Sequence, residues 1–174
     1  MTNEQKEFAL SDGGQLRLKP VTSGDEEFLV SVYASTRADE LAQVDWPEET
    51  KNAFIRWQFE RQREEYYQRF PDAEYYVIVI DNRPAGRIWI GTDDHQIRLM
   101  DIAILPEFQN RGGGTQLVHW LIDRAKKAGK PLRHMVFMLN EDADRFYERL
   151  GFVTFETSGA YKHMEYPVQS SAVD

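Results

Sequence analysis

Residues 96–128 read QIRLMDIAILPEFQNRGGGTQLVHWLIDRAKKA, and this stretch decides the fold. The run from Gln96 to Leu105 is largely apolar, which is typical of a buried strand, and Pro106 cannot extend a strand ladder. After the glycines, apolar residues recur at helical spacing until Gly129, followed by Pro131, ends the helix. The stretch therefore predicts a strand, a glycine turn and a helix.

The glycine turn is expected to bind an anion. The first amides of a helix have no intrahelical partner, and glycines let a phosphate approach those amides closely while the helix dipole favours negative charge. The hexad from Gln109 to Gly114 has the spacing Gln-x-x-Gly-x-Gly. It lacks the Lys-Ser/Thr pair of a P-loop and does not complete the Gly-x-Gly-x-x-Gly of dinucleotide folds.

A second block, residues 140–152, reads NEDADRFYERLGF. Together the two blocks resemble the signatures of the GNAT N-acetyltransferase superfamily: its pyrophosphate loop Gln/Arg-x-x-Gly-x-Gly/Ala and its Asn, Ala, aromatic-Tyr and Gly-Phe pattern. The resemblance is at the level of motifs from about Tyr75 to Tyr166, and only architectural before that.

The fold class expected is α/β (α+β), with a mixed, mostly antiparallel central sheet flanked by helices, as in GNAT-like acyltransferases. Strands are predicted at 15–21, 74–80, 84–91, 96–105 and 132–138, with a closing hairpin over 153–166. Helices are predicted from about 25 to 38, from 48 to 69, after the glycine loop, and from residue 140. Residues 1–174 are expected to form one domain, with 1–14 and 167–174 loosely ordered.

Composition excludes several classes of protein. The 174 residues, 41% hydrophobic, suit one domain with a substantial core. A formal net charge of −8 makes nucleic acid an unsuitable partner and favours a cationic acceptor, although the charge could equally serve solubility alone. No apolar run reaches membrane-spanning length, no signal peptide is evident, and there is no cysteine, so we expect a cytoplasmic protein without membrane attachment.

The resemblance implies a site for acetyl-CoA as co-substrate. Ile102 and Ile104 would pair with pantetheine at the place where two parallel strands part, and Asn140 would contact the cofactor arm. Tyr147 would lie near the sulfur and donate its proton to the departing thiolate. The residues expected to bind the pyrophosphate are Gln109, Asn110, Arg111, Gly112, Gly113, Gly114 and Thr115.

The sequence has no obvious base for removing the proton of the amine. Many relatives place a carboxylate or histidine on the strand before the loop, but the corresponding positions here are Met100 and Arg98. Asp101 is the catalytic candidate beside them, although strand alternation directs it to the opposite face unless a bulge intervenes. Weaker candidates for the base are His134, Glu40 and Asp45. No pair of histidines has ligand spacing, so no metal is expected.

The expected activity is transfer of an acetyl group from acetyl-CoA to a primary amine, with a small-molecule acceptor favoured. Two alternatives remain open: a regulatory module that binds acetyl-CoA without turnover, and an acetyltransferase that modifies protein lysines or N-termini. A homodimer is a further open alternative, because relatives often pair through their last strands.

Overall fold

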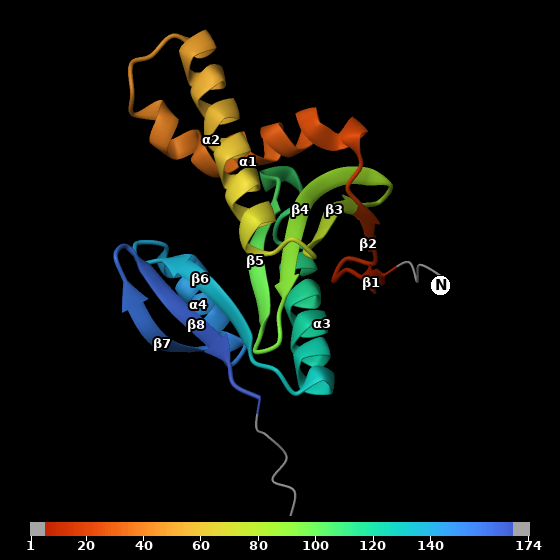
Figure 1. Ribbon diagram of the computed structural model, residues 1–174. Coiled ribbons are helices and arrows are strands. Elements are labelled where there is room, and N and C mark those ends of the chain that lie inside the picture. The colour runs from red at the N-terminus through yellow and green to blue at the C-terminus, as the bar shows by residue number, and fades with distance from the viewer. Residues whose placement is uncertain (1–5, 169–174) are drawn as a thin grey trace, which may run out of the picture.

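The computed structural model describes residues 6–168, which build one mixed sheet between two helical layers (Figure 1). The elements in chain order are β1 (Glu7–Ala9), β2 (Gln15–Pro20), η1 (Ser23–Asp25), α1 (Glu26–Ala42), α2 (Glu48–Arg69), β3 (Glu74–Ile80), β4 (Arg83–Thr92), β5 (Ile97–Ile104), η2 (Pro106–Phe108), α3 (Gly113–Ala128), β6 (Leu132–Phe137), α4 (Glu141–Arg149), β7 (Val153–Ser158) and β8 (Tyr161–Tyr166).

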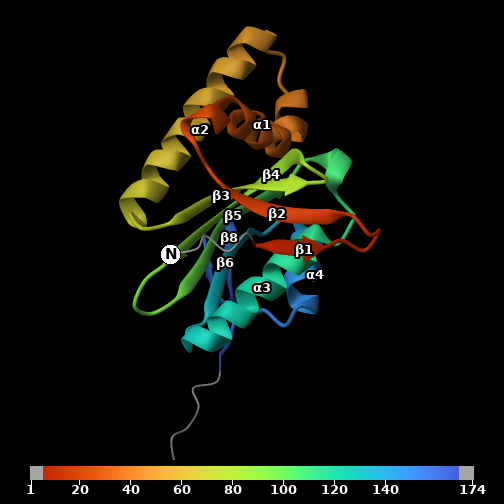
Figure 2. The same cartoon turned by 90° about the vertical axis from the view of Figure 1, so that its right-hand side faces the viewer.

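The sheet has eight strands in the order β1-β2-β3-β4-β5-β6-β8-β7. Every neighbouring pair is antiparallel except β5 and β6, which are parallel and joined through α3. This is the mixed, mostly antiparallel sheet flanked by helices that the sequence predicted. Figure 2 shows the layers edge on, with α1 and α2 on one face of the sheet and α3 and α4 on the other.

Each face of the sheet buries its own hydrophobic cluster, as strand alternation requires. The cluster under α3 and α4 includes Ile78, Ile88, Leu99 and Leu121. The cluster under α1 and α2 is richer in aromatic rings and includes Phe59 and Trp89. Aromatic residues of α2 therefore pack the helix onto the sheet, which is the structural role that we expect of such rings in a long charged helix.

Two details differ from the sequence-based expectation. Helix α1 runs to Ala42, so the connection to α2 is shorter than predicted. The expectation that residues 1–14 are loosely ordered is wrong for the described part, because Glu7–Ala9 form β1 against β2. The three-residue strand was missed because it is too short to show an alternating pattern. Residues 1–5 and 169–174 lie outside the described part of the chain.

Candidate active site

The glycine loop connects β5, through η2, to the N-terminus of α3. Gly112 precedes the first residue of α3 and adopts φ +82°, a left-handed conformation that favours glycine. Asn110, two residues earlier, is also left-handed, with φ +60°. The amide of Gln116 donates to the carbonyl of Gly112 (3.0 Å), so the amides of residues 113–115 precede the first bond of the helix and have no intrahelical acceptor. The loop thus presents a helix N-terminus with free amides, an arrangement that can bind an anion.

The side chain of Arg111 forms ion pairs with two carboxylates outside the glycine loop. Its Nε lies 2.5 Å from Asp12 Oδ2 and its Nη2 lies 2.7 Å from Asp81 Oδ2, and its carbonyl accepts from the amide of Ser11. A hydrogen bond from the Arg111 guanidinium is the main cause that lowers the pKa of the Asp12 carboxyl. The pKa of Asp81 is lowered mainly by a hydrogen bond from the Gln15 amide and next by the bond from Arg111. Arg111 therefore ties the loop to two neighbouring turns, and a charge contact with pyrophosphate would require it to leave both carboxylates.

The parallel strands β5 and β6 part immediately after they meet. They pair only at Ile97↔Leu132 and Arg98↔Arg133, although both strands continue for several residues, and Figure 1 shows β6 leaning away from β5. On its other side, β5 stays bound to β4, where the amide of Leu105 donates to the carbonyl of Ala85. Because successive residues alternate the direction of their backbone groups, Ile102 and Ile104 direct theirs into the opening.

One of these backbone groups is already used. Gln109 Nε2 donates to the carbonyl of Ile104 (2.7 Å), so this side chain holds the loop against the end of β5. Within the sheet opening, a pantetheine arm could therefore pair with the amide of Ile104 and with both groups of Ile102. The expected role of Gln109 thus becomes one of shaping the loop rather than of contacting phosphate through its side chain.

A bulge in β5 brings Asp101 to the face of α1 and α2. The register with β4 shifts between Trp89, which faces Asp101, and Ile90, which faces Leu99, so Met100 is the extra residue. The bulge was the condition under which Asp101 could share the face of Met100. Its Oδ2 lies 2.5 Å from the Nε of Arg87, whose side chain is 1% exposed. Burial raises the pKa of Asp101, and Arg87 opposes that shift.

His134 and Tyr147 meet on the other face of the sheet, beside the opening. The His134 ring lies 4.7 Å from that of Tyr147, and its Nδ1 is 2.8 Å from the carbonyl of Leu99. Burial is the main reason that the pKa of His134 falls to about 4, and burial also raises the pKa of the Tyr147 phenol above its usual value. Near neutral pH the imidazole is therefore uncharged and the phenol keeps its proton.

Sequence reasoning ranked His134 low because nothing local in the sequence shows where two strands separate. The signal that could have raised it is its position two residues into the strand that pairs in parallel with β5, where the ladder was expected to open.

The two sequence blocks come together in space. A Cβ built on Gly114 at the start of α3 would lie 3.7 Å from Cζ of Phe146 in α4. Asn140 is the N-cap of α4, and its Oδ1 accepts from the amide of Ala143 (3.1 Å). Its expected contact with the cofactor arm remains a prediction. The loop, the sheet opening, Tyr147 and the start of α4 thus form one candidate site.

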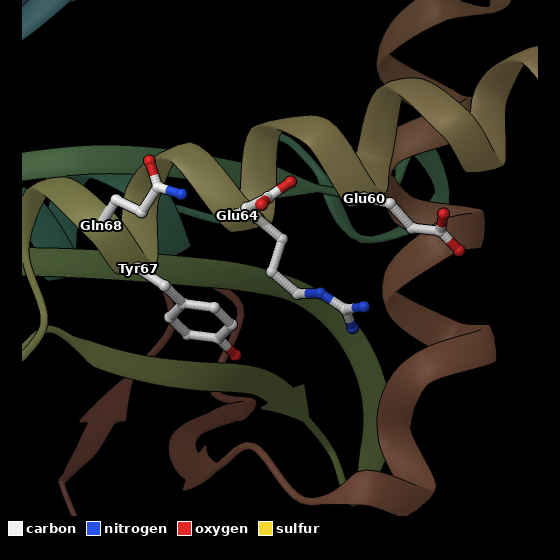
Figure 3. Close-up of a pocket in the computed structure, with 5 residues that line it drawn as sticks. Glu60, Glu64, Tyr67 and Gln68 are labelled. Atoms are coloured by element: carbon white, nitrogen blue, oxygen red, sulfur yellow. The ribbon is translucent and has the colours of Figure 1, made fainter.

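The remaining candidates lie apart from it. Glu40, near the end of α1, pairs with Arg37 at 3.0 Å, and Asp45 lies exposed in the connection to α2. Figure 3 shows a surface depression along α2, lined by Glu60, Arg63, Glu64, Tyr67 and Gln68. None of these five residues belongs to the loop, β5 or α4, so the depression is not the candidate site.

Among residues 6–168 there is no cluster of three or more side chains suited to a metal ion, and no helix long and apolar enough to cross a membrane.

A glycine loop at a helix N-terminus, beside a parted pair of parallel strands, is the arrangement expected for an acyltransferase of the GNAT kind. The chain belongs to the acetyltransferase (GNAT) family, whose model matches residues 38–152. It is 28% identical over 110 residues to an uncharacterized N-acetyltransferase, MJ1207, of Methanocaldococcus jannaschii, covering 59% of this chain and 46% of that protein. It is 31% identical over 71 residues to the uncharacterized N-acetyltransferase CgeE of Bacillus subtilis, covering 41% of this chain and 27% of that protein. The matched region thus spans less than half the length of either relative.

Solved structures agree on the fold. The PaiA N-acetyltransferase of Thermoplasma acidophilum, in complex with coenzyme A, superposes with a TM-score of 0.66 at 20% identity, covering 86% of this chain and 97% of that chain. A Corynebacterium glutamicum protein described as histone acetyltransferase HPA2 and related acetyltransferase gives the same TM-score at 18% identity, covering 95% of this chain and all of that one. At these identities the likeness concerns the fold alone.

Proposed function

We propose that this protein transfers an acetyl group from acetyl-CoA directly to a primary amine. The observation that supports this most is the juxtaposition of free amides at the start of α3 with an opened strand pair and a buried tyrosine. Family membership, and the coenzyme A held by the structurally similar PaiA protein, support the same donor.

The residues present fit coenzyme A. The amides of residues 113–115 would receive the pyrophosphate, and an added Cβ at Gly114 would meet only Phe146, at 3.7 Å, so the approach to these amides is open. The backbone groups of β5 that face the opening, at Ile102 and Ile104, would pair with the pantetheine amides as an added strand would. When bound, acetyl-CoA supplies a thioester whose carbonyl carbon is open to nucleophiles.

In the proposed reaction an ammonium acceptor first loses one proton to solvent. The neutral amine nitrogen then forms a bond to that carbonyl carbon, the carbon–sulfur bond breaks, and the nitrogen loses a second proton while the sulfur gains one. Tyr147 donates the proton to the sulfur, because its raised pKa keeps the phenol protonated. Asp101 is the carboxylate that the bulge brings to the face of α1 and α2. We propose that the acceptor enters on this face and that Asp101 receives the amine proton through water. A lysine-like amine costs roughly 4 to 5 kcal/mol to deprotonate at neutral pH, which is why such an acceptor for the proton is needed.

The test combines calorimetric titration with acetyl-CoA and a thiol-release assay over pooled amines. The wild type should bind acetyl-CoA and release thiol only when an amine is present. Tyr147→Phe should bind equally well but release thiol about 10 to 100 times more slowly, in the range of lost general acid catalysis. Tyr76→Phe is the matched control, because it removes a hydroxyl that bonds to Lys6 and Glu74 elsewhere in the sheet.

Other outcomes separate the alternatives. Binding without thiol release from any small amine, but with release from lysine-bearing peptides or free protein N-termini, would identify a protein acceptor. Binding without release from either would identify a regulatory module, an alternative suggested by Met100 and Arg98 at the positions where relatives hold a base. Absence of binding would overturn the proposal.

A further inference from the structure

Arg98 is a largely buried residue whose guanidinium has no anionic partner within residues 6–168. Only 8% of this residue is exposed, and within residues 6–168 it takes part in no ion pair and no side-chain hydrogen bond. This is unusual in a chain with 29 acidic and 21 basic residues, where most arginines could find a carboxylate. Among the described residues, the buried side-chain nitrogen and oxygen atoms that lack a hydrogen-bond partner include none of Arg98, so its guanidinium reaches the surface, where an anion could contact it.

The surroundings of Arg98 are positive. In the parallel ladder Arg98 lies opposite Arg133, and residues in register direct their side chains to the same face of the sheet. Arg133 pairs with Glu165 at 3.0 Å and stacks over the ring of Phe155. Burial is the main cause that lowers the pKa of Arg98, and the charge of Arg69 adds to it. Asp93 attracts Arg98 from the turn before β5, but that carboxylate already accepts bonds from the residue 95 and 96 amides and from the side chain of residue 96.

The C-terminal end of α2 covers this position. The hydroxyl of Tyr66 donates to the carbonyl of Met100 (3.2 Å). The ring of Phe70, directly after α2, lies against Gly91, where an added Cβ would be 2.6 Å from Cδ1, and Gly91 is the partner of Arg98 in β4. Arg69, the last residue of α2, is therefore brought close to Arg98.

Arg98 also lies at the base of the strand opening, on the face where the acceptor would enter. Alternation assigns Ile97 and Leu99 to the α3 cluster, so Arg98 faces α1 and α2, as Asp101 does after the bulge. Because Met100 is the bulge residue, Arg98 and Asp101 face Gly91 and Trp89, which are two residues apart in β4. At about 3.3 Å per residue along a strand, the Cα atoms of Arg98 and Asp101 therefore lie roughly 7 Å apart. An arginine side chain and a short acceptor can span that distance.

We infer that Arg98 binds an oxyanion of the acceptor, so that the substrate is a primary amine that also bears a carboxylate or phosphate. Arg133 and Arg69 add positive charge around the anion, and Tyr66 helps close the site from α2. This inference rests on the proposed acetyl transfer. It also reverses the expectation from net charge, because the acidic surface as a whole favours a cation while this buried position favours an anion.

The test is a set of matched amines assayed by thiol release. Glycine, β-alanine and 6-aminohexanoate are compared with ethylamine, propylamine and hexylamine, and O-phosphoethanolamine is compared with ethanolamine. For at least one pair the anionic amine should have a kcat/KM about tenfold or more above its neutral partner, as a charge-assisted bidentate contact allows. The carboxylate and phosphate arms distinguish the two kinds of oxyanion.

Variants of Arg98 test whether this residue causes the preference for anionic amines. Arg98→Met should raise KM for the preferred anionic amine about tenfold or more while the neutral amine is unchanged, and Arg98→Lys should recover part of the loss. Stability of Arg98→Met should not fall, because no ion pair is removed. Arg61→Met is the matched control: Arg61 is an exposed arginine of α2 whose only ion pair within residues 6–168 is with Glu64.

Failure of this inference differs from failure of the proposed function. Equal acetylation of anionic and neutral amines, or an unchanged preference in Arg98→Met, would overturn the inference and leave acetyl transfer intact. If the wild type acetylates no amine, the Arg98 Nε resonance is followed by NMR in the protein saturated with coenzyme A as β-alanine or O-phosphoethanolamine is added. A shift of that resonance would support the anion site, and its absence with both probes would overturn it.

Discussion

At the scale of single residues, the candidate site depends on the conformation of the loop backbone and on the charge of the side chains beside its free amides. Gly112 needs its left-handed conformation, whereas Gly114 is already helical, and a Cβ there would meet only Phe146, at an ordinary contact distance of 3.7 Å. Gly114 can therefore be substituted without harm to the fold. This separates the effect of a side chain on folding from its effect on phosphate binding.

We predict that Gly114→Asp folds normally and loses coenzyme A. A carboxylate in the first turn of α3 favours the helix by about 0.3 to 1 kcal/mol, but it should weaken binding of the pyrophosphate about tenfold or more. Thermal melting and calorimetric titration measure the two effects. Gly114→Ala is the matched control and should bind coenzyme A as the wild type does. Equal affinity of the Asp variant and the wild type would show that the phosphates bind elsewhere.

His134 should make stability depend on pH. Its pKa is lowered from 6.5 to about 4 in the folded protein, so the unfolded chain binds the proton first as pH falls. Its contribution is fully present above pH 6.5 and is lost between pH 6.5 and pH 4, to a total of about 3 kcal/mol. Denaturant unfolding across this range should show a shallower decline for His134→Asn, whose Nδ2 can still donate to Leu99. Asp101, with its raised pKa, acts in the opposite direction in both proteins. Parallel curves for the two proteins would refute the role of His134.

At the scale of secondary-structure elements, the bulge in β5 changes which face a side chain occupies. Met100 is the inserted residue, and it places Asp101 beside Arg87 on the face of α1 and α2 rather than in the α3 cluster. The same strand provides the opening towards β6 and the last residues before the glycine loop. One irregular strand thus determines the positions of the proposed acceptor face, the proposed pantetheine contacts and the loop.

Because Asp101 pairs with an almost fully buried arginine, replacing its carboxylate by a neutral side chain should reduce the stability of the fold. We predict that Asp101→Asn lowers the free energy of unfolding by about 3 to 5 kcal/mol, since Arg87 is then left buried without a charge partner. The double variant Asp101→Asn with Arg87→Met should recover most of that loss in chemical denaturation. If this double variant is stable but releases thiol slowly, Asp101 also acts in proton removal. A change below about 1 kcal/mol in the single variant would contradict the buried pair.

At the scale of the whole molecule, the narrowest connection in the sheet is between β5 and β6, with two residue pairs. The hydrophobic cluster under α3 and α4 bridges this connection, because it joins Leu99 of β5 to Leu132 of β6 and Met164 of β8. The strand β7 forms one edge of the sheet, with Val153 and Phe155 exposed. Pairing of two copies through this edge stays a prediction.

We predict that the chain unfolds as one domain in a single cooperative transition, because the shared core should prevent the β6-β8-β7 part from unfolding alone. Far-ultraviolet circular dichroism and tryptophan fluorescence should give coincident denaturation curves. Trp89 and Trp120 report on opposite faces of the sheet. Two separated transitions would show that the strand opening divides the molecule into independent units.

Apart from β1 and the end of α1, the sequence alone determined the elements, their order and the loop, because these depend on local patterns. Residues 48–69 and 74–80 follow their predicted bounds, and Gly129 ends α3 in a left-handed conformation as expected. Asn140 as an N-cap was also predictable from its own neighbourhood. Hydrophobic periodicity, caps and glycine conformations act over a few residues, so they can be recognised without the tertiary structure.

Only the tertiary structure decided the chemistry around the loop. The sequence does not reveal that Arg111 is bound by Asp12 and Asp81, that Met100 is a bulge residue, or that His134 lies beside Tyr147. It also does not show that Arg98 has no anionic partner in the part of the chain that the structure describes. Each of these facts depends on segments far apart in the chain and on the register of neighbouring strands, where a shift of one residue moves a side chain to the other face.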